Sequence, residues 1–216
     1  MEHISQIVGK ALTATRAPSM PVKAVNTQAL AEWMGFNLKG HPATCRQLET
    51  MVNATGQFIT EMKAGSTPRF LSLLGTSGAG KTMLAKRVWC WFEAWGKFYT
   101  EPACGANCVR SGQFCNWRQF VEQCLGSGDF SRTLDLCEDW FVVLDDIGAK
   151  RDKSGAWLDK LDTILAHRSE RSWTLITANL SLQEISNQLD TRIASRLLRG
   201  GSVVVEVDVP DYSVRK

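Results

Sequence analysis

The chain has 216 residues, which allows one substantial domain with a small extension and a well-buried core. Its composition is typical of globular proteins, and its net charge of +3 is too small to argue for a nucleic-acid partner by itself. No apolar run approaches the ~20 residues that span a bilayer, and residues 1–16 lack the pattern of a signal peptide. We therefore expect a cytoplasmic protein with no membrane partner, whose seven cysteines stay reduced.

Residues 1–43 are predicted to be an N-terminal arm rather than a domain. Two prolines lie in residues 16–28, which is typical of a linker, and residues 27–36 favour a short helix. The arm could dock a partner or pack on its own core, and the sequence leaves both open. Residues 45–62 predict an amphipathic helix near the start of a single domain that covers residues 44–216.

A strand, a glycine-rich loop and a helix follow, with the spacing G-x-x-x-x-G-K-T in the loop. Residues 69–75 form an apolar run typical of a buried parallel strand. Glycines let backbone N–H groups converge on phosphate oxygens, Lys81 can reach the β- and γ-phosphates, and the Thr82 hydroxyl can bind Mg²⁺. The cofactors expected from this motif are ATP and Mg²⁺. The predicted phosphate-binding residues are Gly75, Thr76, Ser77, Gly78, Ala79, Gly80, Lys81 and Thr82.

The segment at residues 99–115 is predicted to be irregular and rich in cysteine. Cys104, Cys108 and Cys115 could hold zinc, but their spacing lacks a C-x2-C pair and no histidine is near, so buried thiols are favoured. Two aromatic side chains farther along, Trp117 and Trp157, are candidates for contact with single-stranded nucleic acid. Five other tryptophans are expected to pack in or beside the core: Trp89, Trp91, Trp95, Trp140 and Trp173.

Two further apolar strands end in polar side chains. Residues 140–144 lead into Asp145 and Asp146. We expect Asp145 to act on the metal ion beside Thr82, and Asp146 to orient or deprotonate an attacking water. The next strand ends at Asn179, which could bond the γ-phosphate or the water, or could cap the following turn. The sequence leaves both roles of Asn179 open.

Residues 190–199 favour a helix, and residues 202–209 predict a final strand. Arg192, Arg196 and Arg199 share one face of this helix. Such a face is commonly a solvated surface, but in a phosphate-binding protein it can also present an arginine to the γ-phosphate site of a neighbouring subunit.

In this order, the motifs GTSGAGKT, VVLDDIG, TLITANL and LDTRIASRLLRGG resemble the AAA+ ATPases of the DnaC/IstB type. That family comprises replicative helicase loaders and the ATPase subunits of certain transposons. The similarity covers about residues 44–212. It implies an α/β P-loop NTPase with an AAA+ core, in which a parallel sheet is flanked by helices, without a C-terminal helical lid.

The resemblance also implies roles for individual residues. Asn179 matches the sensor 1 position and Arg196 matches the arginine finger, with Arg192 as an auxiliary candidate. Lys81, Asp146, Asn179 and Arg196 therefore form the expected catalytic set. Many AAA+ motors carry glutamate where this chain has Asp146. Aspartate is one methylene shorter, so we expect slow hydrolysis that suits a switch better than a motor.

The resulting hypothesis is an ATP-hydrolysing switch that forms a homo-oligomer with ATP and loads or regulates a replicative helicase. Direct contact with single-stranded DNA is left open. One alternative is a transposition-associated AAA+ regulator with a transposase-type partner. Two others are a P-loop small-molecule kinase and an ATP-binding scaffold that never hydrolyses its ligand.

Overall fold

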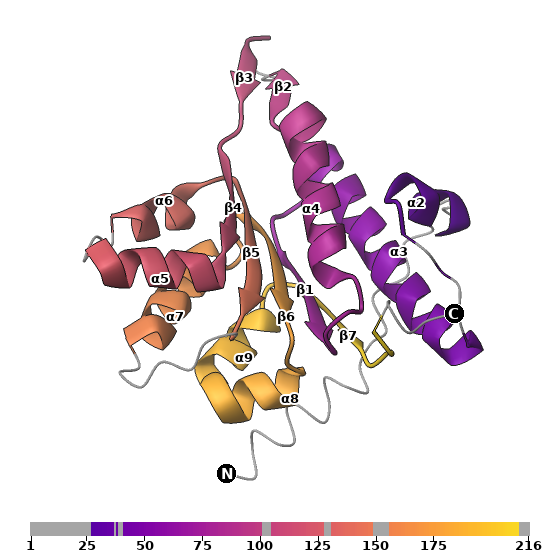
Figure 1. The fold of residues 1–216 in the computed structure, drawn as a ribbon. Helices are drawn as coiled ribbons and strands as arrows, with labels where there is room; N and C mark the ends of the chain where they lie inside the picture. The colour runs from indigo at the N-terminus through magenta and orange to yellow at the C-terminus, as the bar shows by residue number, and fades with distance from the viewer. Residues whose placement is uncertain are drawn as a thin grey trace.

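The computed structural model describes residues 27–36, 38, 41–100, 105–127, 131–148 and 156–211. Its elements alternate between strands and helices along most of the chain (Figure 1). In chain order they are α2 (Thr27–Trp33), α3 (Pro42–Ala64), β1 (Phe70–Gly75), α4 (Lys81–Trp91), β2 (Phe98–Thr100), β3 (Asn107–Val109), β4 (Gly112–Asn116), α5 (Trp117–Ser127), α6 (Arg132–Glu138), β5 (Phe141–Ile147), α7 (Ala156–Arg168), β6 (Trp173–Ala178), α8 (Leu182–Glu184), α9 (Thr191–Leu197) and β7 (Val203–Val207). Single π-helical turns follow α4 and α8.

Five parallel strands form the main sheet, in the order β4–β5–β6–β1–β7. The strand that leads into the phosphate loop, β1, thus lies between β6 and β7, and its Leu71 pairs with both Leu175 and Val203. Because both faces of the sheet are covered, β1, β5 and β6 are almost continuously buried. The sequence predicted these three strands and β7, and the structure confirms the α/β class with a parallel sheet flanked by helices.

Helices cover both faces of the sheet (Figure 1). Along β5, Phe141 and Val143 join the core beneath α3 and α4, whereas Val142 and Leu144 join the core beneath α5, α7 and α9. This alternation follows from the two-residue period of a strand. In the part of the chain that the structure describes, no helix is both long and apolar enough to cross a bilayer.

Part of the predicted N-terminal arm packs on the domain. Helix α2 contacts α3, and Met34 and Phe36 are buried in the same core as α3 and α4. The close approach is visible at Gly56 of α3, where an added Cβ would lie 2.3 Å from a methyl carbon of Leu30. Residues 27–36 therefore cover the domain, while residues 1–26 lie outside the described residues.

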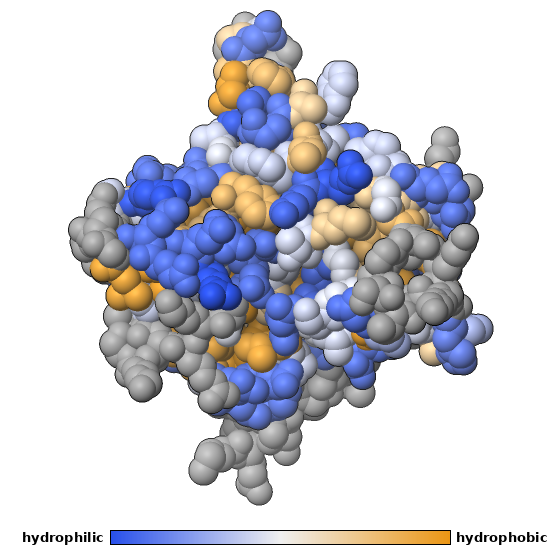
Figure 2. All heavy atoms as spheres, in the orientation of Figure 1, coloured by the Kyte–Doolittle hydropathy of each residue, from blue (hydrophilic) through white to orange (hydrophobic). Residues whose placement is uncertain are grey.

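The prediction of an irregular segment at residues 99–115 is wrong. Strands β2 and β3 pair as an antiparallel hairpin with Phe98 opposite Val109, and β4 forms an edge of the main sheet. At the root of the hairpin, the Arg110 guanidinium stacks on the rings of Tyr99 and Trp140, at 4.4 and 4.1 Å. The hairpin projects from the body, and some hydrophobic colour lies on it (Figures 1 and 2). Its Phe98 and Val109 are exposed.

The three cysteines that could hold zinc do not form a metal site in the described residues. Cys115 lies buried in β4, where burial raises its thiol pKa to about 12, while Cys108 lies in the hairpin and Cys104 falls outside the described residues. No cluster of metal-binding side chains occurs among the residues that could be searched.

Trp117 and Trp157 are only 5% and 4% exposed, so the hypothesis that they stack on nucleic acid is wrong. Conversely, Trp95, predicted to pack near the core, is 74% exposed.

Arg168, the last residue of α7, ties the helices to the sheet. Its guanidinium donates to the carbonyl oxygens of Leu136, Asp139 and Trp173 at 2.8, 2.8 and 2.6 Å, and to Thr174 Oγ1 at 2.9 Å. Burial lowers its pKa to about 10, an effect that the negative charge of Asp139 opposes. These bonds fix the C-terminal end of α7 and the start of β6, the strand that ends at the site described below.

We predict that Arg168→Met lowers the free energy of unfolding by roughly 3 kcal/mol, because it leaves buried carbonyl groups without a donor. Urea denaturation followed by circular dichroism measures the change. The matched control is Arg171→Met, three residues farther along the chain, where the side chain is exposed and the expected change is within about 0.5 kcal/mol. Equal losses in the two variants would contradict the role of Arg168.

Candidate functional site

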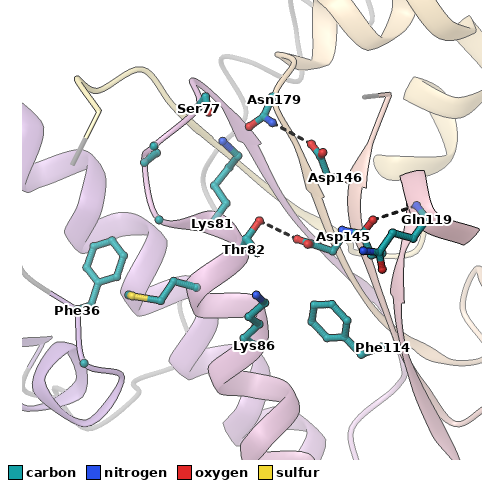
Figure 3. A pocket seen from close by; sticks show the side chains of 16 residues that line it. Phe36, Ser77, Lys81, Thr82, Lys86, Phe114, Gln119, Asp145, Asp146 and Asn179 are labelled. Atoms are coloured by element: carbon teal, nitrogen blue, oxygen red, sulfur yellow. Dashed lines mark hydrogen bonds between the residues drawn. The ribbon is translucent and has the colours of Figure 1, made fainter. Parts of the chain in front are cut away.

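A cavity of about 780 Å³ lies at the C-terminal ends of β1, β5 and β6. Its floor is the loop at residues 77–80 and the first turn of α4, and its far wall includes Phe114 and Gln119 (Figure 3). Strand ends meet here because the strands are parallel, and the N-terminus of α4 points its free N–H groups toward the same space. The sequence-predicted loop residues and acidic residues therefore meet at one opening.

Lys81 lies folded over the glycine-rich loop at residues 75–80. Its Nζ donates to the carbonyl oxygens of Gly75 and Thr76 at 2.9 and 2.6 Å, and the residue is only 4% exposed. Burial lowers the pKa of Lys81 to about 8, while the charges of Asp146 and Asp145 act in the opposite direction. A phosphate oxygen entering the cavity could replace these carbonyl oxygens as the partner of the ammonium group.

Two glycines of the loop are required by close packing. At Gly75, where φ is +111°, an added Cβ would lie 2.0 Å from the carbonyl oxygen of Val207 in β7. At Gly80, where φ is +98°, it would lie 2.5 Å from a ring carbon of Phe36. Thr76 fastens the same loop to the segment after β7 through a hydrogen bond from its Oγ1 to the carbonyl oxygen of Val209, at 2.8 Å. The loop is thus held from both sides.

Thr82 and Asp145 meet although they are 63 residues apart in sequence: Thr82 Oγ1 donates to Asp145 Oδ1 at 2.8 Å. Asp145 is 2% exposed. A hydroxyl and a carboxylate oxygen side by side at the mouth of a phosphate loop are the hard oxygen donors that Mg²⁺ prefers. The residues present therefore fit the metal ion that the motif predicts.

Asp146 and Asn179 form the second polar pair of the cavity. Asn179 Nδ2 donates to Asp146 Oδ1 at 2.8 Å, and both side chains face the loop (Figure 3). Burial, followed by the charge of Asp145, raises the pKa of Asp146, while Lys81 and Arg118 oppose this shift. A carboxylate with a raised pKa is a better proton acceptor, which suits the role predicted for Asp146.

Several residues of the site were missed at the sequence level. Thr177 bonds both acidic residues, and its position two residues before Asn179 places it on the same side of β6, a spacing that could have indicated it. Phe36 and Gly35 form a wall of the cavity, although they belong to the predicted arm. No sequence signal links that wall to the loop, because the contact depends on how α2 packs.

The arginines of α9 lie elsewhere. Arg196 makes a two-point contact with Asp162 of α7, through Nε to Oδ1 and through Nη2 to Oδ2, the latter at 3.1 Å. Arg192 pairs with Asp190 and Asp159. The hydrogen bond from Arg196 lowers the pKa of Asp162. Among the described residues that line the cavity, neither arginine appears.

Comparison with known proteins supports the fold. No family model matches the sequence, and no curated protein matches it either. Among solved structures, DnaI is 21% identical with a TM-score of 0.58, over 75% of this chain and 82% of that chain. The DnaC helicase loader is 18% identical with a TM-score of 0.56, over 82% of this chain and 99% of that one. The replication initiator DnaA, bound to AMPPCP and single-stranded DNA, is 14% identical with a TM-score of 0.56, over 74% of this chain and 46% of that one. The chain therefore has the fold of DnaC-type AAA+ ATPases, as its motifs predicted.

We predict that Lys81→Met weakens binding of an ATP analogue by roughly 10- to 100-fold, because a hydrogen bond to a charged group is lost. Isothermal titration calorimetry measures the affinity. Lys97→Met, which removes a lysine outside the cavity beside the β2–β3 hairpin, is the matched control and should bind normally. Unchanged affinity in the Lys81 variant would contradict the assignment of the loop.

Proposed function

We propose that this chain is an ATP-binding and ATP-hydrolysing AAA+ switch that assembles on ATP and loads or regulates a replicative helicase. The observation that carries this proposal is the convergence of two polar pairs, Thr82–Asp145 and Asp146–Asn179, on the cavity that contains Lys81. A loop that merely held phosphate would not require a second carboxylate that an amide side chain holds beside the first. Its presence supports hydrolysis.

Each residue has a distinct task in this proposal. The loop N–H groups and Lys81 grip the phosphates, and Thr82 with Asp145 holds Mg²⁺, which neutralises phosphate charge when bound. Asp146 accepts a proton from the attacking water. Asn179 keeps the Asp146 carboxylate turned toward the phosphates through the bond at 2.8 Å.

The partner is proposed from similarity rather than from contacts. The DnaC structure is that of a helicase loader, and the DnaA structure contains single-stranded DNA. Both support a role in DNA replication for a chain of this fold. Residues 1–43 are the segment proposed to dock the helicase. In its described part, Trp33 of α2 is 54% exposed, while Met34 and Phe36 are buried against the domain.

We expect Asp146→Asn to bind Mg²⁺ and ATP normally and to lower turnover about 100-fold, because a general base typically contributes 10²–10⁴ in rate. Asp145→Asn should weaken Mg²⁺-dependent binding and turnover together. Phosphate release and titrations with and without Mg²⁺ separate the two effects, and Asp135→Asn, on the exposed side of α6, serves as the control. Wild-type hydrolysis in both site variants would refute the proposed chemistry.

Arg196 is proposed to act on the site of a neighbouring subunit. It lies outside the cavity of its own chain, and its contact with Asp162 holds the guanidinium at the surface between α7 and α9, with its side chain 21% exposed. An arginine that stabilises transition-state charge from a neighbour is worth about 10³–10⁵ in rate. The proposal therefore requires activity that rises with assembly.

We predict that Arg196→Ala binds ATP normally, is inactive alone, and regains activity when mixed with Asp146→Asn, because mixed interfaces pair an intact acidic site with an intact arginine. The rate of the wild-type protein should rise with its concentration. Arg199→Ala, at an exposed position beyond α9, is the matched control and should remain active. Concentration-independent rates without recovery on mixing would assign Arg196 to a structural contact.

A further inference from the structure

We propose that Thr177 is a positioning residue for both acidic side chains of the site. Its hydroxyl holds the Asp145 carboxylate against Thr82, and it also fixes the backbone of Asp146, so that one side chain on β6 sets the geometry of the metal-binding and water-binding groups together. The inference rests on the proposed ATPase function and extends it to a residue that contacts neither phosphate nor metal.

A β-bulge creates this arrangement. Leu144 pairs with Ile176 and Ile147 pairs with Ala178, so β5 has one more residue than β6 between these two pairs. The extra residue leaves Asp145 and Asp146 opposite a single partner, Thr177. Bulges redirect side chains and are common beside active sites. Here the bulge turns two consecutive residues toward one hydroxyl group.

The Thr177 hydroxyl is used as donor and acceptor at once. It donates to Asp145 Oδ1 at 2.7 Å and accepts from the backbone N–H of Asp146 at 2.8 Å. The same carboxylate oxygen of Asp145 accepts the bond from Thr82. Thr177 is 1% exposed, so water cannot easily replace it. Loss of the hydroxyl would leave the Asp146 N–H without its partner and would free the Asp145 carboxylate to rotate.

The backbone of Asp146 explains why such a restraint is needed. Its φ is +62°, in the left-handed region that residues other than glycine rarely adopt. This conformation directs the carboxylate to Asn179, which is bonded at 2.8 Å. Thr177 holds the N–H of the strained residue, so the hydrogen bonds form one chain from Thr82 through Asp145, Thr177 and Asp146 to Asn179. The metal side and the water side of the cavity are thereby coupled.

The required chemistry is specific to a hydroxyl. Valine matches the shape of threonine in a buried strand but can neither donate nor accept, whereas serine can do both. Thr133 provides a control, because its buried Oγ1 has no hydrogen-bond partner among the described residues and it lies in α6, away from the cavity. Thr133→Val therefore removes a buried hydroxyl without breaking a bond.

The experiment compares Thr177→Val, Thr177→Ser and Thr133→Val with the wild type in three measurements. These are Mg²⁺ titration of the binding of a fluorescent ATP analogue, steady-state phosphate release, and hydrogen–deuterium exchange of residues 145–147 in nucleotide-free protein. In Thr177→Val we expect kcat to fall by roughly 10- to 100-fold. The Mg²⁺ concentration that gives half-maximal binding of the analogue should rise by a similar factor, as is usual for partners of metal ligands. Exchange at Asp146 should be faster, and affinity without Mg²⁺ should be unchanged. Thr177→Ser and Thr133→Val should resemble the wild type.

The outcomes separate the two proposals. A wild-type protein that binds ATP, together with a Thr177→Val variant that has normal Mg²⁺ dependence and normal exchange, would overturn the role of Thr177 and leave the proposed function intact. A serine variant as impaired as the valine variant would assign the effect to the lost methyl group and also overturn it. If the wild type bound no ATP, the proposed function would fall and this inference with it. If Thr177→Val does not fold, Thr177→Cys, whose thiol is a weaker donor and acceptor, should give the same defects in milder form, and normal behaviour of that variant would count against the proposal.

Discussion

The hydrogen bond between Thr82 and Asp145 is the contact on which the site depends, because it joins the phosphate loop to the acidic strand. In the sheet order, β6 lies between β1, which leads to the loop before Thr82, and β5, which carries Asp145. The two motifs therefore do not lie on neighbouring strands. The bond forms because α4 leaves the loop after β1 and crosses over β6, contacting both β6 and β5. The path of α4 across the sheet therefore brings the loop with Thr82 next to Asp145.

The charges of the cavity bear on the proposed binding of a metal ion together with a nucleotide. Asp145 and Asp146 both act to raise the pKa of Lys81, and a second lysine, Lys86, also lines the cavity. A polyphosphate entering such a site would meet two carboxylates as well as two ammonium groups. A divalent cation beside Thr82 and Asp145 would offset the repulsion between these carboxylates and the phosphates.

Other parts of the fold hold these groups in place. Arg168 holds the beginning of β6 through bonds to Trp173 and Thr174, and the end of the same strand carries Thr177 and Asn179. On the other side, Phe36 packs against Gly80 of the loop. The turn that follows α2 therefore supplies part of the cavity wall, through Gly35 and Phe36. A change in that packing would reach the phosphate site directly.

The sequence by itself determined the phosphate loop, the apolar strands β1, β5, β6 and β7, and the acidic and amide residues at the strand ends. These features are local: a glycine spacing, a short apolar run and the residue that follows it are each visible within ten residues. They also sufficed to predict the class of fold, which the structural comparisons confirm. The predicted roles of Asp146, Asn179 and Arg196 stay predictions until the experiments above are done.

Only the tertiary structure decided which distant residues meet. The hairpin of β2 and β3 was missed because its strands have three residues each and its exposed apolar side chains do not follow a buried pattern. Trp117 and Trp157 resemble exposed aromatic residues in sequence, yet the packing of α5 and α7 buries both. The pairing of Arg196 with Asp162, 34 residues earlier, and of Thr177 with the bulge in β5 depends on helix and strand registers. Such registers are set by long-range packing, which no local pattern of residues encodes.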